Sequence, residues 1–163
     1  MPNLPVTRAL LALVWAAALV LAVGSDVPTT DTDLPFAAAA VLATYPLIDV
    51  IVSVLSGRRL NAAISGIAAL AIAVTGFGAD AGATLAAFGT WAIVSGALQF
   101  ATALPERQIP MLISGGLSTL AGLSFLATSG TTTAHIANLA GYMAVGAALY
   151  LVSAARGRHP QTA

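Results

Sequence analysis

The stretch LPFAAAAVLATYPLIDVIVSVLSGRR, residues 34–59, decides the fold class of this chain. Up to Leu55 it carries one acidic side chain, Asp49, and no basic one, and it ends on the pair Arg58 and Arg59. A run of about 20 mainly apolar residues can cross the hydrocarbon core of a bilayer as a helix. The stretch therefore predicts a transmembrane helix that ends at a basic membrane surface.

The rest of the chain has the same character. Of its 163 residues 58% are hydrophobic and 7% are charged, whereas about a quarter of the residues in a soluble domain are charged. We expect an all-α bundle of six transmembrane helices that forms a single membrane domain, residues 1–163. The predicted spans are Leu4–Val23, Leu34–Leu55, Asn61–Phe77, Ala83–Leu104, Ile109–Thr128 and Ala134–Ala155. Asn61 is a candidate cap of the third helix, and Pro110 suits the first turn of the fifth.

The charges predict how the helices are oriented. With six spans every Arg falls on one side of the membrane. The connections on the other side contain four acidic residues, Asp26, Asp31, Asp33 and Asp80. Basic residues are retained on the cytoplasmic side, so we expect both termini in the cytoplasm and a flexible C-terminal tail at 156–163. The Arg positions are 8, 58, 59, 107, 156 and 158.

The first span has an alternative interpretation. Arg8, the apolar run 9–23 and the small residues Ala22 and Gly24 resemble a secretory signal peptide with its cleavage site. Cleavage would leave five helices. We favour six, because an internal repeat requires the first helix.

The repeat consists of three tandem helical hairpins, residues 4–55, 60–104 and 109–155. Asp49, Gly96 and Gly146 each follow an aromatic residue and are 47 and 50 residues apart. Small residues also recur one turn apart in two of the helices, and we expect them to form packing seams. These are Ser114, Ser118 and Gly122 in the fifth helix, and Ala92 and Gly96 in the fourth.

The stretch GTWAIVSGALQ, residues 89–99, resembles the HdeD-like family of bacterial acid-resistance membrane proteins. ISGGL at 113–117 and Gly141-Tyr142 with Gly146 also fit, and the resemblance covers about residues 60–158. It implies six helices in the bacterial inner membrane and a link to acid stress, without an established catalytic residue. Asp49 departs from the pattern, because the later hairpins have Gly at that position.

Asp49 is the first candidate functional residue. A carboxylate at this depth in a bilayer costs several kcal/mol, so it should face the bundle interior or water. Burial favours the neutral form of a carboxyl group. We therefore expect Asp49 to be uncharged unless water reaches it, and to donate a hydrogen bond to a free carbonyl or to the hydroxyl of Ser53, Ser65 or Ser95. It is either a structural residue or a proton or ion site.

Two further polar residues are candidates. Gln99 lies deep in the fourth span, and we expect it to hydrogen-bond between helices. His135 lies at the outer end of the sixth span, and histidine changes charge under mildly acidic conditions. It is therefore either an acid sensor or an ordinary interfacial residue.

The sequence predicts no catalytic, cofactor-binding or metal site, and nothing in its charge favours nucleic acid. Ser95 and His135 superficially resemble an intramembrane serine protease, but the residue two positions before Ser95 is Ile93, where that family has Gly. The favoured function is that of a non-enzymatic HdeD-like membrane protein contributing to acid or envelope stress tolerance. The alternatives are a small transporter or channel that uses Asp49, and a scaffold. Expected partners are the lipid bilayer and either a second copy or another membrane protein.

Overall fold

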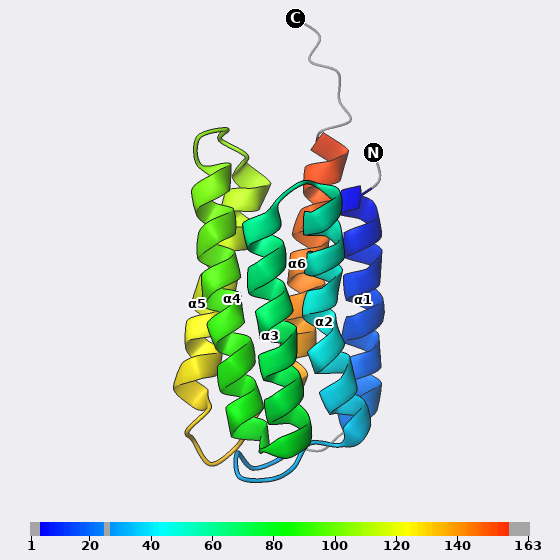
Figure 1. Ribbon diagram of the computed structural model, residues 1–163, viewed down its shortest axis with the longest axis vertical. Helices are drawn as coiled ribbons and strands as arrows, with labels where there is room; N and C mark the ends of the chain where they lie inside the picture. Colours follow the sequence, from blue (N-terminus) through cyan, green and yellow to red (C-terminus); the bar gives the residue numbers. More distant parts are fainter. Residues whose placement is uncertain (1–3, 25–26, 157–163) are drawn as a thin grey trace, which may run out of the picture.

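The computed structural model describes residues 4–24 and 27–156, and this part of the chain forms six α-helices (Figure 1). All six are long and apolar enough to cross a membrane, as expected. Asp26, Arg158 and the expected tail from 157 lie outside the described residues. The helices are α1 (Leu4–Val23), α2 (Phe36–Leu55), α3 (Arg59–Gly78), α4 (Ala81–Ala103), α5 (Ile109–Thr128) and α6 (Ala137–Arg156).

The outer surface of the bundle is apolar. Large hydrophobic side chains on its outside include Leu21, Phe36 and Val74, which are 83%, 78% and 71% exposed. Such a surface would be unfavourable in water but suits the acyl chains of lipids. Together with the six long apolar helices, it identifies the chain as a multi-pass membrane protein.

The connection between α2 and α3 corrects one prediction. Gly57 adopts φ +72, and Arg58 N–H donates to the carbonyl of Ser53 at 2.8 Å, which closes α2 with a glycine turn. The chain reverses at once, so α3 begins at Arg59 and Asn61 lies inside it. Asn61 therefore does not cap α3, and its side-chain amide donates to Ser53 Oγ at 2.5 Å.

Two other helix starts have a clear local cause. The Asp80 side chain caps α4, because its Oδ1 accepts a hydrogen bond from Ala83 N–H at 2.6 Å. Pro110 lies in the first turn of α5, as expected.

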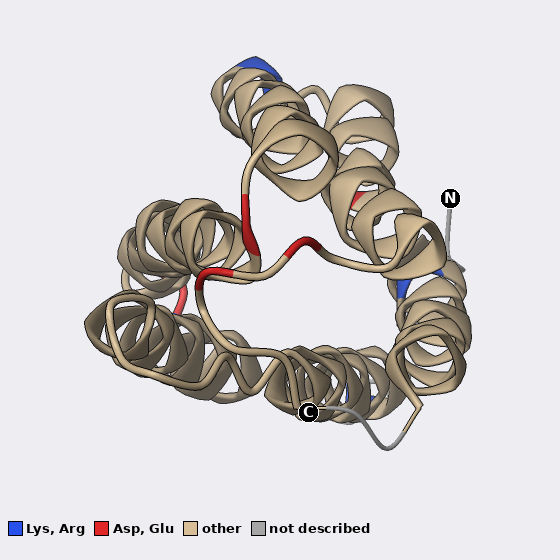
Figure 2. Ribbon diagram, turned by 90° about the horizontal axis from the view of Figure 1, so that it is seen from below, with Lys and Arg blue, Asp and Glu red and all other residues tan. Residues whose placement is uncertain are grey.

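Consecutive helices run in opposite directions and form a closed ring, seen end-on in Figure 2, in which α6 packs against α1. The most extensive contacts join α4 to α5, α2 to α3, and α1 to α6. These pairs cross the boundaries of the three hairpins that we expected, which would pair α1 with α2, α3 with α4, and α5 with α6. The strongest packing therefore does not follow the sequence repeat.

The residues at the centre of the repeat have different surroundings. Asp49 and Gly146 line the cavity described below. Gly96 instead lies against Gly115 of α5, whose carbonyl oxygen would be 2.8 Å from a Cβ at position 96. The threefold repeat thus stays a prediction from the sequence.

The two ends of the bundle differ in charge. One end, the Arg end, carries the start of α1, the end of α6, and the α2–α3 and α4–α5 connections with Arg58 and Arg107 (Figure 1). The opposite end, the acidic end, carries Asp31, Asp33 and Asp80 on its connections (Figure 2). The Thr29 hydroxyl donates to Asp31 Oδ1 at 2.5 Å and holds the pKa of that exposed carboxyl below its ordinary value.

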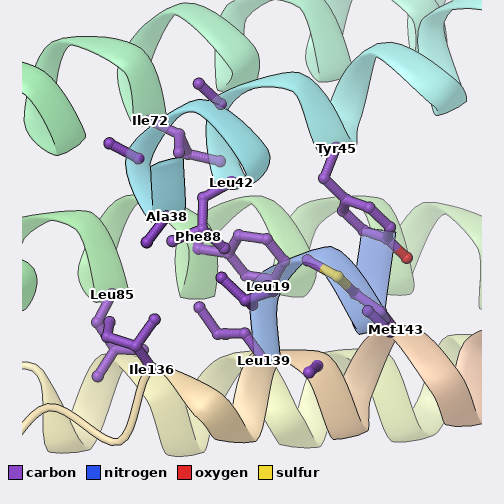
Figure 3. Packing of buried hydrophobic residues seen from close by; sticks show 14 of the residues in the cluster. Leu19, Ala38, Leu42, Tyr45, Ile72, Leu85, Phe88, Ile136, Leu139 and Met143 are labelled. Atoms are coloured by element: carbon purple, nitrogen blue, oxygen red, sulfur yellow. The ribbon is translucent and has the colours of Figure 1, made fainter. Parts of the chain in front are cut away.

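The half of the bundle toward the acidic end is filled with large apolar side chains (Figure 3). Phe88 of α4 is fully buried and is surrounded by side chains from other helices. The side chains around it come from the turns of each helix nearest the acidic end, and together they form a dense core in this half of the bundle. The core includes Leu19, Leu42, Ile72, Leu85, Ile136, Leu139 and Met143, each at most 1% exposed.

The connection between α1 and α2 closes the acidic end. Its described part, residues 27–35, is called the strap. The carbonyls of Thr32 and Thr30 accept hydrogen bonds from Ala81 N–H and Gly82 N–H at 2.9 Å, and that of Pro28 accepts from Ala134 N–H at 2.8 Å. The strap therefore ties the starts of α2, α4 and α6 together across the end of the bundle.

Candidate functional site

A cavity of about 520 Å³ lies between the helices, mainly in the half toward the Arg end. All six helices contribute to its lining. One polar or charged residue from each is Arg8, Asp49, Asn61, Gln99, Ser118 and Tyr150. The site is thus assembled from the whole length of the chain and exists only in the folded bundle.

An aromatic layer separates the cavity from the dense core. Phe88 makes edge-on contacts with Trp91, Phe125 and Tyr142, with ring centroids 5.2, 6.3 and 5.6 Å apart, and Tyr45 stacks on it at 6.0 Å. Every member of this layer except Phe88 also lines the cavity. The layer therefore forms the floor of the cavity.

Arg8 and Asp49 form an ion pair in the wall of the cavity. Their side chains are 14% and 11% exposed. The Arg8 guanidinium also lies 4.0 Å from the centre of the Tyr150 ring, a cation–π contact. The aromatic ring and the carboxylate together hold a cation below the membrane surface, where an isolated charge would be unfavourable.

The ion pair corrects the partner that we expected for Asp49. The side chain faces the bundle interior, as expected, but the Arg8 guanidinium lies against its carboxyl group. Ser65 Oγ lies 3.4 Å from Asp49 Oδ2 and donates to it, whereas we expected a serine to accept. Trp91 Nε1–H in turn donates to Ser65 Oγ at 3.2 Å, so α1, α2, α3 and α4 are joined in one polar network.

The other hydroxyls considered as partners of Asp49 are used elsewhere. Ser53 accepts the hydrogen bond from Asn61, and Ser95 donates to the carbonyl of Trp91 at 2.7 Å. Of these three serines, Ser65 is the one that hydrogen-bonds to Asp49 in the described part of the chain.

Gln99 bridges helices, as expected. Its side-chain amide donates to the carbonyl of Met111 on α5 at 3.3 Å, and its Oε1 accepts from the Tyr150 hydroxyl of α6 at 3.4 Å. Because Tyr150 also contacts Arg8, Gln99 is indirectly connected to the ion pair.

His135 lies outside the site. It is exposed on the connection before α6, at the acidic end, with Nε2 3.4 Å from the Thr133 hydroxyl. Ser95 lies 14 positions along α4 from its start at Ala81, or about 21 Å from the acidic end at 1.5 Å per residue. The structure therefore does not bring together the pair that resembled a serine protease.

The sequence did not indicate Arg8 as part of the site, because a position at the membrane surface also accounts for its charge. A signal was present in the helix register. Arg8 lies four residues inside the start of α1 and Asp49 six residues before the end of α2, so both are about 6 to 9 Å below the same end of the bundle. Two opposite charges at matched depth on adjacent helices are natural partners.

The lining of the cavity has an excess of positive charge. It contains Arg8, Arg58 and Arg59 against the single acidic residue Asp49, a formal charge of +2. Among the described residues no cluster of three or more His, Asp or Glu could hold a metal ion. The charged groups in the lining are thus guanidinium groups and the single carboxyl group of Asp49.

No protein-family model, curated protein or solved structure matches this chain. The resemblance to HdeD-like proteins thus stays a prediction from the sequence.

Proposed function

We propose that this chain is a small membrane transporter that binds its cargo in the cavity and uses Arg8 and Asp49 as exchangeable charges. The observation that supports this best is that a cavity lined by all six helices reaches Asp49. A purely structural bundle would gain stability by filling such a space, since unfilled volume in a protein interior is destabilising. A scaffold would require neither the cavity nor a buried ion pair inside it.

The mechanism follows from the ion pair. In the empty site Asp49 neutralises Arg8. A proton or cation bound at Asp49 releases Arg8 for an anion, and an anion bound at Arg8 releases Asp49. Either event changes the contacts that join α1, α2 and α6, because Arg8 also contacts Tyr150. Cargo binding is thereby coupled to helix packing, as an alternating-access cycle requires.

The positions of the aromatic layer and the strap support a conformation that is open on one side. The dense core and the strap lie between the Arg8–Asp49 pair and the acidic end, whereas exposed Arg58, Arg59 and Leu60 belong to the lining at the Arg end. We propose that the Arg end is cytoplasmic, in the plasma membrane of a bacterial cell, because positive charge is retained on that side. The cavity would then face the cytoplasm.

A role in acid tolerance, which the HdeD-like resemblance implies, is compatible with the same site. Asp49 is the acidic residue of the lining, and its neutralisation would leave Arg8 without a counter-ion. We propose this as the physiological setting of the transporter and assign the chain no enzymatic activity.

Sided labelling tests the proposal without knowledge of the cargo. The chain has no cysteine, so a single introduced thiol is unique. A Cβ at Gly146, which lines the cavity, meets no atom within 4 Å, and the same holds for Gly130 near the acidic end. The variants Gly146→Cys and Gly130→Cys are reconstituted in vesicles and treated with a membrane-impermeant maleimide from each side.

A transporter exposes its site to both sides in turn. We expect Gly146→Cys to react quickly from the Arg side and slowly from the acidic side, and the ratio of the two rates to shift at least threefold when Asp49→Asn is added. Gly130→Cys should react from the acidic side alone. If Gly146→Cys never reacts from the acidic side, the cavity is a one-sided pocket and the proposal is wrong.

A further inference from the structure

The cavity is open sideways, between α5 and α6. Of the neighbouring pairs in the ring, these two helices share the least extensive contacts. Leu117 of α5 and Val145 of α6 line the cavity and are also 45% and 51% exposed. Since both lie in membrane-spanning helices, the cavity continues into a groove that faces the hydrocarbon of the bilayer.

This chain does not fill the groove. Gly141 and Gly146 of α6 belong to its lining, and a Cβ at either position would meet no atom within 4 Å. The α6 residues in the lining extend from Asn138 to Tyr150, which is about 18 Å along the helix at 1.5 Å per residue. The groove therefore has room for an elongated group that lies parallel to the helices.

The two ends of this space have different chemistry. Arg8, Arg58 and Arg59 lie toward the Arg end, where lipid headgroups meet a transmembrane bundle. The walls toward the aromatic floor are mainly apolar and include Ala121 and Phe125, and the Ser118 and Tyr142 hydroxyls among them hydrogen-bond to each other. Guanidinium groups match the geometry of phosphate oxygens, whereas the apolar walls suit a hydrocarbon chain.

We infer that the cavity binds an anionic membrane lipid, with its phosphate among Arg8, Arg58 and Arg59 and one acyl chain in the groove between α5 and α6. In this position the phosphate stays at the level of the headgroups and the acyl chain at the level of the hydrocarbon. The cavity volume of about 520 Å³ lies within the range usual for pockets that bind one small organic ligand. The inference rests on the proposed function, for which it names the cargo class.

The chain contains a suitable fluorescent reporter. It has two tryptophans, and Trp91 lines the cavity while being only 4% exposed. In a Trp15→Phe protein, Trp91 is the sole tryptophan and is shielded from lipids around the bundle. A quencher on an acyl chain reaches Trp91 only if that chain enters the cavity.

The experiment measures Trp91 fluorescence of the Trp15→Phe protein in vesicles whose lipids carry brominated acyl chains. We expect phosphatidylglycerol, which is anionic, to quench at least twice as strongly as zwitterionic phosphatidylcholine. Gly146→Leu and, separately, Gly141→Leu fill the groove and should at least halve the quenching. Gly130→Leu is the matched control outside the cavity and should leave it unchanged. Joint replacement Arg58→Gln and Arg59→Gln should abolish the difference between the two lipids.

Three results distinguish this inference from the proposed function. The inference is overturned if both lipids quench Trp91 equally and if Gly146→Leu and Gly141→Leu do not reduce this quenching. Quenching by aqueous iodide but not by brominated lipid would show a water-filled cavity, which overturns the lipid while leaving a transporter of soluble cargo. Selective quenching by the anionic lipid, without transfer of the brominated lipid from one leaflet of the vesicle to the other, would support the lipid site and overturn transport.

Discussion

Arg8 and Asp49 are each unfavourable alone within a membrane-spanning helix and become tolerable as a pair. The carboxylate has the Arg8 guanidinium and the Ser65 hydroxyl as partners, and the guanidinium has the carboxylate and the Tyr150 ring. Removing one member leaves the other charge buried without compensation, which costs more than the pair itself contributes.

The first prediction concerns this pair. Asp49→Asn and Arg8→Gln should each lower the free energy of unfolding by about 3 kcal/mol, because each leaves one uncompensated charge. The double variant should be more stable than either single variant. Chemical unfolding of the purified protein in detergent measures all three. If the two single effects simply add in the double variant, the residues are not energetically coupled.

At the scale of helices, the contact between α4 and α5 depends on glycine. A Cβ at Gly89 would lie 2.8 Å from the Gly122 carbonyl oxygen, and one at Gly122 would lie 2.6 Å from that of Gly89. Farther along, Gly96 and Gly115 make a similar contact, and Ser118 Oγ donates to the carbonyl of Ala92 at 3.1 Å. The small-residue seams expected from the sequence are confirmed for Ala92, Gly96, Ser118 and Gly122, where the two backbones approach closely, whereas Ser114 lines the cavity.

The second prediction tests this seam with a matched pair of substitutions. Gly122→Ala should destabilise the protein by about 1–3 kcal/mol, because its methyl group forces α4 and α5 apart. Gly141→Ala, in the open groove, should be neutral or stabilise by up to about 1 kcal/mol, since alanine favours helix more than glycine does. Unfolding in detergent compares the two. Equal effects of both substitutions would show that the close approach is not needed for stability.

At the scale of the whole molecule, the bundle is dense toward one end and hollow toward the other. Large apolar side chains and the strap fill and cover the acidic end, while the charged residues of the cavity lie toward the Arg end. A transport cycle would therefore require the dense half to open. The hydrogen bonds of the strap to Ala81, Gly82 and Ala134 are the first contacts that such an opening would break.

The third prediction concerns the orientation of this asymmetric bundle in a cell. Exposed Glu106 lies on the α4–α5 connection at the Arg end, and Gly130 lies at the acidic end. In intact cells the impermeant maleimide should label Gly130→Cys but label Glu106→Cys only after the membrane is permeabilised. The physical reason is retention of the Arg-rich connections in the cytoplasm. The reverse labelling pattern would place the cavity on the outer side.

The sequence by itself determined the number, type and approximate limits of the helices. Runs such as Leu4–Val23 and Ile109–Thr128 became helices with the predicted bounds, because backbone groups in hydrocarbon must be hydrogen-bonded within the segment. It also placed Asp49 inside the bundle and Gln99 between helices, since polar groups avoid lipid. These properties depend on the local composition of one segment at a time.

Only the tertiary structure decided which helices pack most closely, that Arg8 is the partner of Asp49, and that a cavity opens between α5 and α6. These features depend on the rotation of each helix about its axis and on its distance from its neighbours. In an apolar, Ala- and Gly-rich chain many rotations bury similar surfaces, so hydropathy does not distinguish them. The choice among them is made by close backbone contacts such as Gly89 with Gly122, and by the requirement that the two charges at matched depth meet.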